Sequence, residues 1–425
     1  MPEYTPRAHQ RRVRSWWGDP MVTAVNALGI TQITAWGTSY YCLGVLAKPI
    51  VAETGWAMTT VLLGFSVALL VMGCISTGVG RLIDRLGARA VMILGTLIVS
   101  AGLLALAQVR GPTSYVAVWA VLGLGMRCCL YDAAFAALVQ VAPTRGRKAI
   151  SYLTLYGAYA STVFWVIGHY LNAAYGWRGT LTLFAAINLA VCLPLTWVGL
   201  ARREATGDTA VATPDPTSPD GPVLQGRRRV VGMILFALIM SMNGFVFGVI
   251  SLQLVPLLEA AGLAGATAVW VASLKGHGQC AGRLIEIVFG RNLKAMTIAR
   301  IAIGVVPVAL LLLVLAQGAL WQLVAFTTLL GASQGVITIV RGAVPLALFG
   351  AQGYGAVLGM IATPILLVNA FSPAIFALAI DRLGHQLALY ALLGCALATW
   401  IALELMSRWY EGAQQHRAHE SEQTL

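Results

Sequence analysis

The stretch GVGRLIDRLGARAVMILG at residues 78–95 lies between two long apolar segments, and its core recurs in the other half of the chain. The second copy is CAGRLIEIVFGRNLKAMTIA at residues 280–299. Both contain Gly-Arg-Leu-Ile followed by an acidic residue, at 80–84 and at 282–286. Internal similarity of this kind is typical of proteins built from structural repeats. The repeat therefore predicts two homologous halves.

The composition indicates that lipid surrounds these halves. Of the 425 residues, 58% are hydrophobic and 10% are charged, and the mean hydropathy is +0.78. Soluble globular proteins carry about 25% charged residues, so this chain lacks the charge that a water-exposed surface needs. The 45 glycines also suit membrane helices, where small residues let backbones approach closely.

The length of the apolar segments predicts how often the chain crosses the membrane. A spanning helix needs about 20 mostly apolar residues. The predicted spans are 21–51, 58–82, 89–109, 114–142, 149–174, 179–201, 230–259, 266–290, 296–317, 319–346, 354–378 and 384–407. We therefore expect an all-α membrane protein with twelve transmembrane helices in two pseudo-symmetric six-helix bundles.

A polar segment divides the two halves. The sequence RREATGDTAVATPDPTSPDGPVLQGRRR at 202–229 is rich in Pro, Gly, Thr and Asp, which is typical of a flexible linker. The predicted domains are an N-terminal bundle at 1–204, a cytoplasmic linker at 205–228 and a C-terminal bundle at 229–425.

The basic residues predict the orientation. They cluster at the even-numbered connections and in the two tails; Arg81, Arg85 and Arg283 are examples. The opposite side holds only Lys48, Arg110, Arg178 and Arg382. Cytoplasmic loops carry such an excess of Lys and Arg. We expect a multi-pass protein of the cytoplasmic membrane with both termini in the cytoplasm. The net charge of +12 is then a property of loops, and we expect no nucleic-acid partner.

The first copy of the repeat resembles the loop 2–3 signature of the major facilitator superfamily of transporters. The matching positions are Gly80, Leu82, Asp84, Arg85, Gly87 and Arg89. The sequence departs from the signature at Ile83, usually a small residue, and at Ala88, usually a basic one. The second copy departs further, at Ile287 and Gly290. YGWRGTLTLFAAIN at 175–188 resembles the family's loop 5–6 segment. Within the superfamily, the pattern is nearest to the monocarboxylate and oxalate/formate carriers.

This resemblance implies a set of gating residues where two helices meet a cytoplasmic loop. Asp84 and the nearby arginines can form contacts that break and re-form between two arrangements of the bundles. The predicted gating residues are Gly80, Asp84, Arg85, Gly87, Arg89 and Glu286. The alternative is that these are ordinary loop charges placed by the membrane orientation.

Several charged residues lie inside the predicted spans. A charge at mid-bilayer costs about 2.5–3.5 kcal/mol on insertion scales, so such residues are expected to face a cavity or one another. In a continuous helix, Arg127 and Asp132 are five residues apart and poorly placed to pair, whereas Arg127 and Tyr131 share a face. Asp132 is then expected to pair with a neighbouring helix. The alternative for each charge is a fixed structural ion pair.

The predicted substrate site combines these charges with aromatic residues of the first span. The basic groups outnumber the acidic ones, so a cavity that they line attracts an anion, and Arg binds a carboxylate through two parallel hydrogen bonds. The predicted substrate-binding residues are Arg127, Tyr131, Asp132, Lys275, Gln279, Arg341, Tyr40, Tyr41 and Trp36. The aromatic residues can instead face lipid or pack between helices.

The function predicted is secondary active transport of a small solute, an organic anion such as a monocarboxylate, by alternating access and coupled to a proton. The alternative is efflux of a toxic compound, either a drug or a trivalent metalloid bound by Cys128 and Cys129, although adjacent helical residues point about 100° apart. A carrier fold that acts only as a sensor is a third possibility. The sequence contains no phosphate-binding loop, nucleophile elbow or HExxH motif. We expect no enzymatic activity, no cofactor and no metal.

Overall fold

The computed structural model describes residues 19–204, 224–316 and 318–422, and these residues form helices joined by short connections. The elements are α1 (Pro20–Ala35), η2 (Trp36–Tyr40), α2 (Leu43–Thr54), α3 (Met58–Leu86), α4 (Ala88–Leu106), α5 (Pro112–Cys129), α6 (Tyr131–Val141), η3 (Pro143–Arg145), α7 (Gly146–Gly157), α8 (Ala160–Ile187), η4 (Asn188–Cys192), α9 (Leu193–Gly199), α10 (Gly226–Ala260), α11 (Gly265–Phe289), η5 (Gly290–Asn292), α12 (Ala295–Leu315), α13 (Leu320–Phe349) and α14 (Tyr354–Glu422).

These elements make twelve spans, as predicted. Nine helical runs of the described residues are long and apolar enough to cross a membrane when each is taken alone. The run Pro143–Gly199 contains two spans, because it turns at Gly176, which has a positive φ of 66°. The first span is divided among α1, η2 and α2, and α11 is more polar than the others. Counting these together gives twelve.

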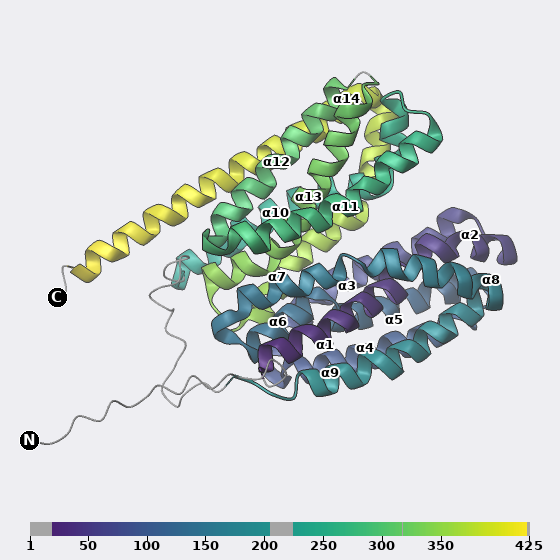
Figure 1. Ribbon diagram of the computed structural model, residues 1–425, viewed down its shortest axis with the longest axis horizontal. Helices are drawn as coiled ribbons and strands as arrows, with labels where there is room; N and C mark the ends of the chain where they lie inside the picture. Colours follow the sequence, from purple (N-terminus) through teal and green to yellow (C-terminus); the bar gives the residue numbers. More distant parts are fainter. Residues whose placement is uncertain (1–18, 205–223, 317, 423–425) are drawn as a thin grey trace, which may run out of the picture.

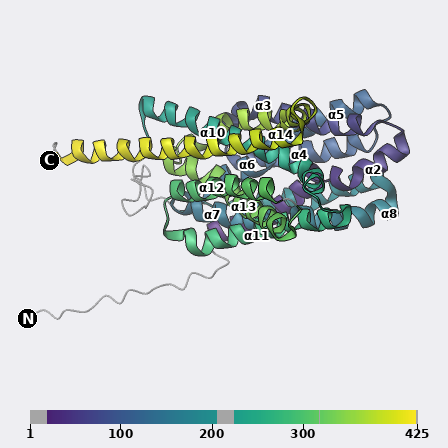
Figure 2. The same cartoon turned by 90° about the horizontal axis from the view of Figure 1, so that it is seen from above.

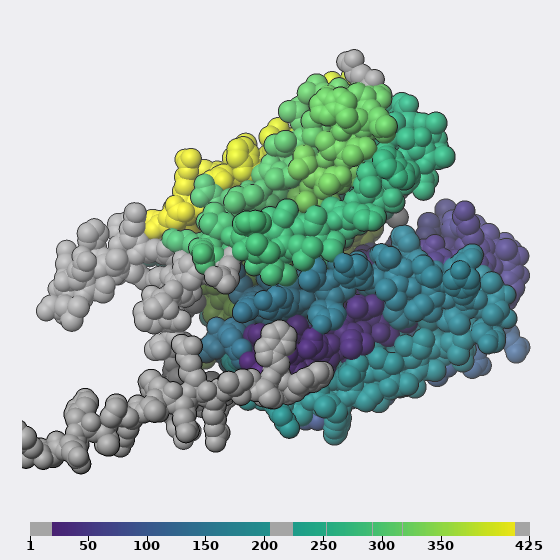
Figure 3. Space-filling view, in the orientation of Figure 1, coloured from purple at the N-terminus to yellow at the C-terminus, as the bar shows by residue number. Residues whose placement is uncertain are grey.

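The helices form two bundles that meet at one end. Figure 1 shows α1–α9 below and α10–α14 above, close together where α9 ends and α10 begins, and apart at the opposite end. We call these the linker end and the far end. The space-filling view shows a cleft between the bundles at the far end (Figure 3). Viewed from above, the last part of α14 extends past the other helices at the linker end (Figure 2).

Close helix packing joins the bundles. α3 packs along the first part of α14, and α7 packs against α11 and α13. Glycines make the first contact possible, because a side chain at Gly80 would overlap the backbone of Gly355, and one at Gly359 would overlap the backbone of Ser76 and Thr77. Small residues allow such approach between membrane helices. The cleft therefore ends where α3 meets α14.

The predicted domain boundaries remain a prediction, because residues 205–223 lie outside the described part of the chain. After these residues, α10 begins at Gly226, which lies inside the range 205–228 predicted for the linker. Just before it, the Leu224 backbone N–H donates to the Leu348 carbonyl at 2.8 Å, which attaches the start of α10 to the end of α13.

Candidate substrate site

A buried ion-pair network connects the two bundles. The Arg127 guanidinium lies 2.7 Å from the Asp132 carboxylate, and so does the guanidinium of Arg341. Asp132 belongs to α6 and Arg341 to α13, so this carboxylate links the N-terminal bundle to the C-terminal bundle. The side chains of Arg127 and Asp132 are 2% and 7% exposed, whereas that of Arg341 is 26% exposed. Arg341 is the member of the network that a solute can approach.

The expectation that Arg127 and Asp132 are poorly placed to pair is wrong, because the fourth span is not one continuous helix. Leu130 adopts an extended conformation, with φ −81° and ψ −166°, and separates α5 from α6. The rule of 100° per residue fails across such a break. Gln32 of α1 donates to the Cys129 carbonyl at 2.8 Å, so it satisfies an acceptor that the break leaves open. The predicted partner of Asp132 on a neighbouring helix is present as Arg341.

The predicted aromatic residues form a wall beside this network. The ring centroids of Trp36 and Tyr40 are 4.8 Å apart, and those of Trp36 and Tyr131 are 5.0 Å apart. Tyr41 lies 5.9 Å from Trp36, and Phe65 of α3, which the sequence did not single out, lies 4.9 Å from Tyr40. The first three pairs are tilted and the last is edge-to-face, at separations where aromatic rings attract one another. All four predicted aromatic residues are half-buried, so part of each ring remains accessible.

The wall owes its position to a local widening of the first span. Trp36–Tyr40 form a π-helical segment between α1 and α2, a feature that is often found at functional sites. The Trp36 indole N–H donates to the Gln32 side chain at 3.1 Å, and the same Gln32 reaches Cys129. The helix break and the aromatic wall are therefore joined through one side chain.

The C-terminal bundle presents polar residues on α11. Lys275 and Gln279 are both half-buried, and the Lys275 ammonium lies 5.3 Å from the centre of the Phe247 ring. Arg283, two turns beyond Lys275, is 4% exposed, and its Nε donates to the Gly335 carbonyl at 3.3 Å. The sequence placed Arg283 among the loop charges; the structure places it inside the protein. A rule based on charge counts cannot distinguish the two, because Arg283 lies near a helix end.

Positive charge exceeds negative charge around this region. Arg127, Arg341, Arg283 and Lys275 contribute four cationic groups, and Asp132 contributes one carboxylate. Glu286, one turn beyond Arg283, is buried and lies 3.9 Å from Arg147 of α7. A low-dielectric region with this balance attracts anions.

At the linker end, Asp84 connects the bundles. Its carboxylate accepts hydrogen bonds from the backbone N–H groups of Gly355 at 3.0 Å and Ala356 at 2.7 Å. Those groups belong to the first turn of α14, where the free N–H groups and the helix dipole favour a negative charge. Asp84 thus contacts a helix terminus rather than the arginines expected as its partners.

Comparison with known proteins agrees with this architecture. Residues 30–285 match the model of the Major Facilitator Superfamily, which is more than half of the chain. The chain belongs to the major facilitator superfamily. No curated protein matches the sequence. Like other proteins of this superfamily, the chain is a secondary transporter of a small solute and not an enzyme.

Solved structures of this superfamily share the fold at low sequence identity. The human organic anion transporter MFSD10 (TETRAN) is 16% identical, with a TM-score of 0.70 over 90% of this chain and 99% of that one. The E. coli fucose:proton symporter FucP is 12% identical, with a TM-score of 0.67 over 91% and 99%. The proton:xylose symporter XylE is 14% identical, with a TM-score of 0.65 over 90% and 94%.

The other predicted gating residues of this superfamily transporter have different surroundings. Arg85 is exposed, and the Arg89 guanidinium lies 4.5 Å from the centre of the Trp197 ring within its own bundle. Gly87 ends α3 with a positive φ of 83°, a conformation that favours glycine. Gln140, which the sequence did not indicate, accepts from the Ala88 N–H at 2.9 Å and donates to the Ile83 carbonyl at 3.3 Å. It holds the turn that presents Asp84.

A second contact at the linker end uses Arg147. Its guanidinium donates to the carbonyls of Leu293 at 2.8 Å and Gly290 at 3.0 Å, just after α11. Carbonyl groups at a helix end favour such a cation. Asp84 of α3, which contacts the start of α14, and Arg147 of α7, which contacts the residues just after α11, therefore join the bundles at the same end of the transporter.

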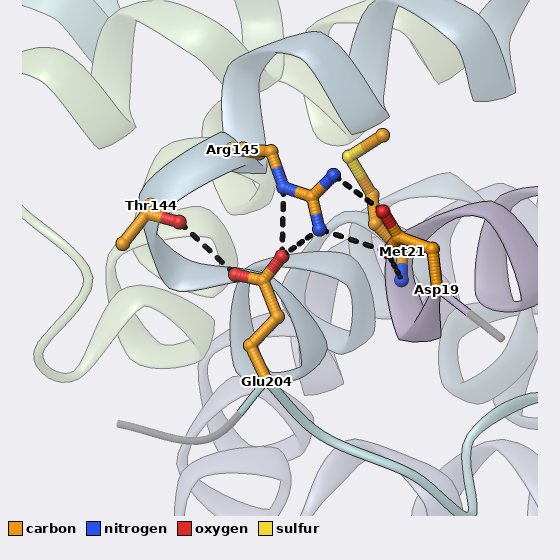
Figure 4. A network of polar contacts seen from close by, with 5 residues as sticks. All are labelled: Asp19, Met21, Thr144, Arg145 and Glu204. Carbon is orange, nitrogen blue, oxygen red and sulfur yellow. Dashed lines mark hydrogen bonds and ion pairs between the residues drawn. The ribbon is translucent and has the colours of Figure 1, made fainter. Parts of the chain in front are cut away.

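A third cluster lies within the N-terminal bundle at the same end (Figure 4). Arg145 donates to Asp19 at 2.7 and 2.8 Å and also binds Glu204, which accepts from Thr144 at 3.0 Å. Asp19 caps α1 by accepting from the Met21 N–H at 2.9 Å. The hydrogen bond from Arg145 holds the pKa of the Asp19 carboxyl below its usual value. The cluster ties the start of α1 to the residue that precedes the predicted linker.

Cys128 and Cys129, the adjacent cysteines of the fourth span, pack as core residues in the part of the transporter that the structure describes. Cys128 and Cys129 are both buried and free, and the Cys128 side chain packs against Gly95 of α4. No group of three or more His, Cys, Asp or Glu residues in that part of the chain is arranged to hold a metal ion. The packing of Cys128 and Cys129 is typical of cysteine used as a small hydrophobic residue.

Proposed function

We propose that the transporter carries a small organic anion, such as a monocarboxylate, across the cytoplasmic membrane by alternating access. The observation that carries this proposal is the excess of cationic groups between the bundles, with Arg341 partly exposed and held by Asp132. Solved structures of this fold are described as carriers of organic anions and of sugars. The fold therefore does not select the substrate, and the proposal depends on the charges of this chain.

The ion-pair network suggests how an anion is recognised. An incoming carboxylate competes with Asp132 for Arg341, whose planar guanidinium can bind it through two parallel hydrogen bonds. Asp132 retains Arg127, so neither carboxylate is left without a cation. Binding in this way weakens a link between the bundles, which couples substrate recognition to their movement.

The same carboxylate is the proposed carrier of a coupling proton. When Asp132 loses Arg341 to the substrate, a proton can replace part of the lost positive charge. We expect Asp132→Asn to abolish the response of uptake to a pH gradient while counterflow of the substrate persists. Uptake that still follows the pH gradient in this variant would assign the proton to another group.

Substitution of Arg341 tests the substrate class. Arg341→Gln should weaken binding of the preferred carboxylate by about ten- to a hundredfold, because a lost charged hydrogen bond costs roughly 1.5–3 kcal/mol. The measurement is counterflow in proteoliposomes with carboxylates, neutral sugars, cationic drugs and arsenite as competitors. Arg300→Gln is the matched control, since Arg300 pairs with Glu404 inside the C-terminal bundle at 2.7 Å. Competition by arsenite or drugs, with no effect of carboxylates, would contradict the proposal.

The orientation is also part of the proposal. With the linker end in the cytoplasm, the cleft opens to the outside and Asp84 and Arg147 hold the cytoplasmic side closed. A cysteine introduced in the predicted linker at 205–228 should react with an impermeant reagent only after the cells are opened. Reaction in intact cells would reverse the orientation.

A further inference from the structure

An arginine on the outer side of the N-terminal bundle lacks an oxygen acceptor. α4 and α9 pack against each other on the side turned away from the C-terminal bundle (Figure 1). Near the linker end of this pair, the Arg89 guanidinium lies 4.5 Å from the centre of the Trp197 ring. Its Nε is buried and has no hydrogen-bond partner within the described residues. An aromatic face attracts a cation, but it does not supply the oxygen acceptor that a guanidinium N–H usually finds.

A second arginine approaches the same turn from the end of α9. A side chain at Gly87 would lie 3.7 Å from Nη2 of Arg203, so this exposed guanidinium lies beside the residue two places before Arg89. The acids nearest along the chain are engaged elsewhere. Asp84 accepts from the first turn of α14, and Glu204 belongs to the cluster of Figure 4. Neither carboxylate therefore balances the charge of the two arginines.

The C-terminal bundle differs at the corresponding place. Its ninth and twelfth spans are α12 and the last part of α14, just as the third span is α4 and the sixth ends in α9. Arg300 of α12 lies 2.7 Å from Glu404 and 3.8 Å from Glu411, both of α14. This bundle supplies carboxylates for its own arginine, whereas the N-terminal bundle supplies an indole. The anion that balances Arg89 is therefore expected to come from outside the bundle.

Further from the linker end, the same surface is apolar and exposed. Trp197 and Val198 of α9 are 58% and 63% exposed, and Leu94 and Leu97 of α4 are 48% and 42% exposed. Leu97 is eight residues beyond Arg89, about 12 Å at 1.5 Å per residue. Tryptophan is enriched where a membrane meets water, which suits Trp197 at the boundary between the cations and the leucines. The surface is cationic at one end and apolar beyond it, the complement of an anionic lipid.

We propose that this surface binds an anionic phospholipid of the cytoplasmic leaflet, with its phosphate at Arg89 and Arg203 and an acyl chain along Leu94 and Leu97. Basic residues beside spanning helices recognise anionic headgroups, and the guanidinium fork suits phosphate oxygens. A soluble phosphate would use the same arginines but not the leucines, so the apolar strip favours a lipid. The inference goes beyond solute transport and does not depend on which solute is carried.

Quenching of Trp197 by brominated lipid tests this lipid site. The purified full-length transporter is reconstituted in phosphatidylcholine vesicles that contain a small fraction of brominated phosphatidylglycerol or, in a matched sample, brominated phosphatidylcholine. The chain has 12 tryptophans, so the signal of the site is the quenching that the wild type shows and Trp197→Phe lacks. Competition with unbrominated lipids then gives relative affinities. Phosphatidylglycerol should compete about five- to thirtyfold better than phosphatidylcholine, because two cations attract its charge.

Variants assign that preference to residues. Arg89→Gln and Arg203→Gln should each reduce it about fivefold. Arg203 is exposed, so its variant tests the site even if the Arg89 variant does not fold. Two matched controls remove the same charge elsewhere. Arg110 is exposed at the far end, and Arg300 has its own carboxylate partners. Arg110→Gln and Arg300→Gln should keep the full preference.

Three outcomes would overturn the lipid site. The first is equal competition by the two lipids. The second is an equal loss of preference in Arg110→Gln, because the preference would then reflect the net charge of the protein. The third comes from separate samples with inorganic phosphate or glycerophosphate, since displacement of brominated phosphatidylglycerol by either one at the concentration at which the lipid competes would assign the arginines to a soluble phosphate. Anion transport is measured independently, through the Arg341 variant.

Discussion

The two copies of the repeated pattern occupy opposite surroundings. In α3, Arg81 and Asp84 are exposed, and Gly80 packs against the backbone of α14 in the other bundle. In α11, Arg283 and Glu286 are buried, and a side chain at Gly282 would overlap the Ala332 backbone of α13 in the same bundle. The glycine of the first copy therefore packs between the bundles, whereas the glycine of the second copy packs inside one bundle, although Glu286 of that copy also lies 3.9 Å from Arg147 of the other bundle.

This difference shows how a duplicated sequence acquires two roles. The small residue permits close approach in both copies, but the neighbour differs, and the neighbour determines whether the acidic and basic groups face solvent or the protein interior. Asp84 reaches the N-terminus of α14, whereas Arg283 donates to the Gly335 carbonyl of α13. The two copies therefore share a backbone arrangement, whereas their charged side chains have different surroundings.

Substitution of each motif glycine by valine should show the difference between the two copies most strongly. Gly80→Val should separate the bundles at the linker end, because its side chain overlaps Gly355. Gly282→Val should instead destabilise the C-terminal bundle by about 1–3 kcal/mol, the usual cost of overpacking. The readouts are the melting temperature and the rate of disulfide formation between Thr77→Cys and Thr363→Cys, whose native hydroxyls are 3.2 Å apart across the bundles.

We expect the cross-linking rate to fall more than about tenfold in Gly80→Val, since a wedge at this contact exceeds the roughly 1.4 kcal/mol that corresponds to that factor. The melting temperature should fall mainly in Gly282→Val. If both substitutions change the same quantity, the two copies have the same role.

The acidic residues of the motif give a smaller effect. Asp84→Asn removes a charge from the N-terminus of α14 and should shift the conformational equilibrium by about 1–2 kcal/mol, a factor of five to thirty. The protein should remain folded and inserted, transport should slow, and cross-linking between positions 77 and 363 should decrease. Glu286→Gln is the comparison variant. A loss of substrate affinity with unchanged cross-linking would show that Asp84 is not a gating residue.

The smallest effect is expected from Asp19, whose contacts stay within one bundle. The pKa of its carboxyl is lowered by Arg145, so its contribution to stability is present above the usual pKa of about 4 and is lost as the pH falls through the lowered value. Asp19→Asn should cost about 0.2–1 kcal/mol at pH 7. The difference in melting temperature from wild type should shrink as the pH falls below the usual pKa of about 4 and disappear below the lowered pKa, and cross-linking should be unaffected. A difference that grows on acidification would be inconsistent with this assignment.

The sequence was sufficient for the fold because hydropathy and the repeat both depend on local composition. Twelve spans, the all-helical class and the superfamily followed from apolar segments and from residues around Asp84. A partner for Asp132 on a neighbouring helix was also anticipated, because a buried carboxylate requires a cation, but the sequence did not indicate that this partner belongs to the other bundle. These inferences depend on two requirements that hold for every membrane protein of this class: apolar helices long enough to span the bilayer, and a cation beside each buried carboxylate.

The arrangement of the site was less predictable, because it depends on departures from ideal helices. The break at Leu130 brings Arg127 to Asp132, and no proline or glycine occupies that position. The widened turn at Trp36–Tyr40 likewise carries no distinctive residue pattern. Arg283 was assigned to a loop because charge counting does not determine which side of a helix a residue faces. Each of these features depends on tertiary contacts such as that of Gln32 with Cys129.

The break at Leu130 also has a consequence for the speed of the transport cycle. When the bundles move apart at the linker end, Arg341 must leave Asp132, and removal of one partner from an isolated buried ion pair costs about 3–5 kcal/mol. Because the break keeps Arg127 beside the same carboxylate, Asp132 is never without a cation during that movement. A barrier lower by about 2.7 kcal/mol makes the movement about a hundredfold faster. Arg127→Gln should accordingly reduce the turnover number far more than the substrate affinity, which makes this distorted helix a determinant of rate.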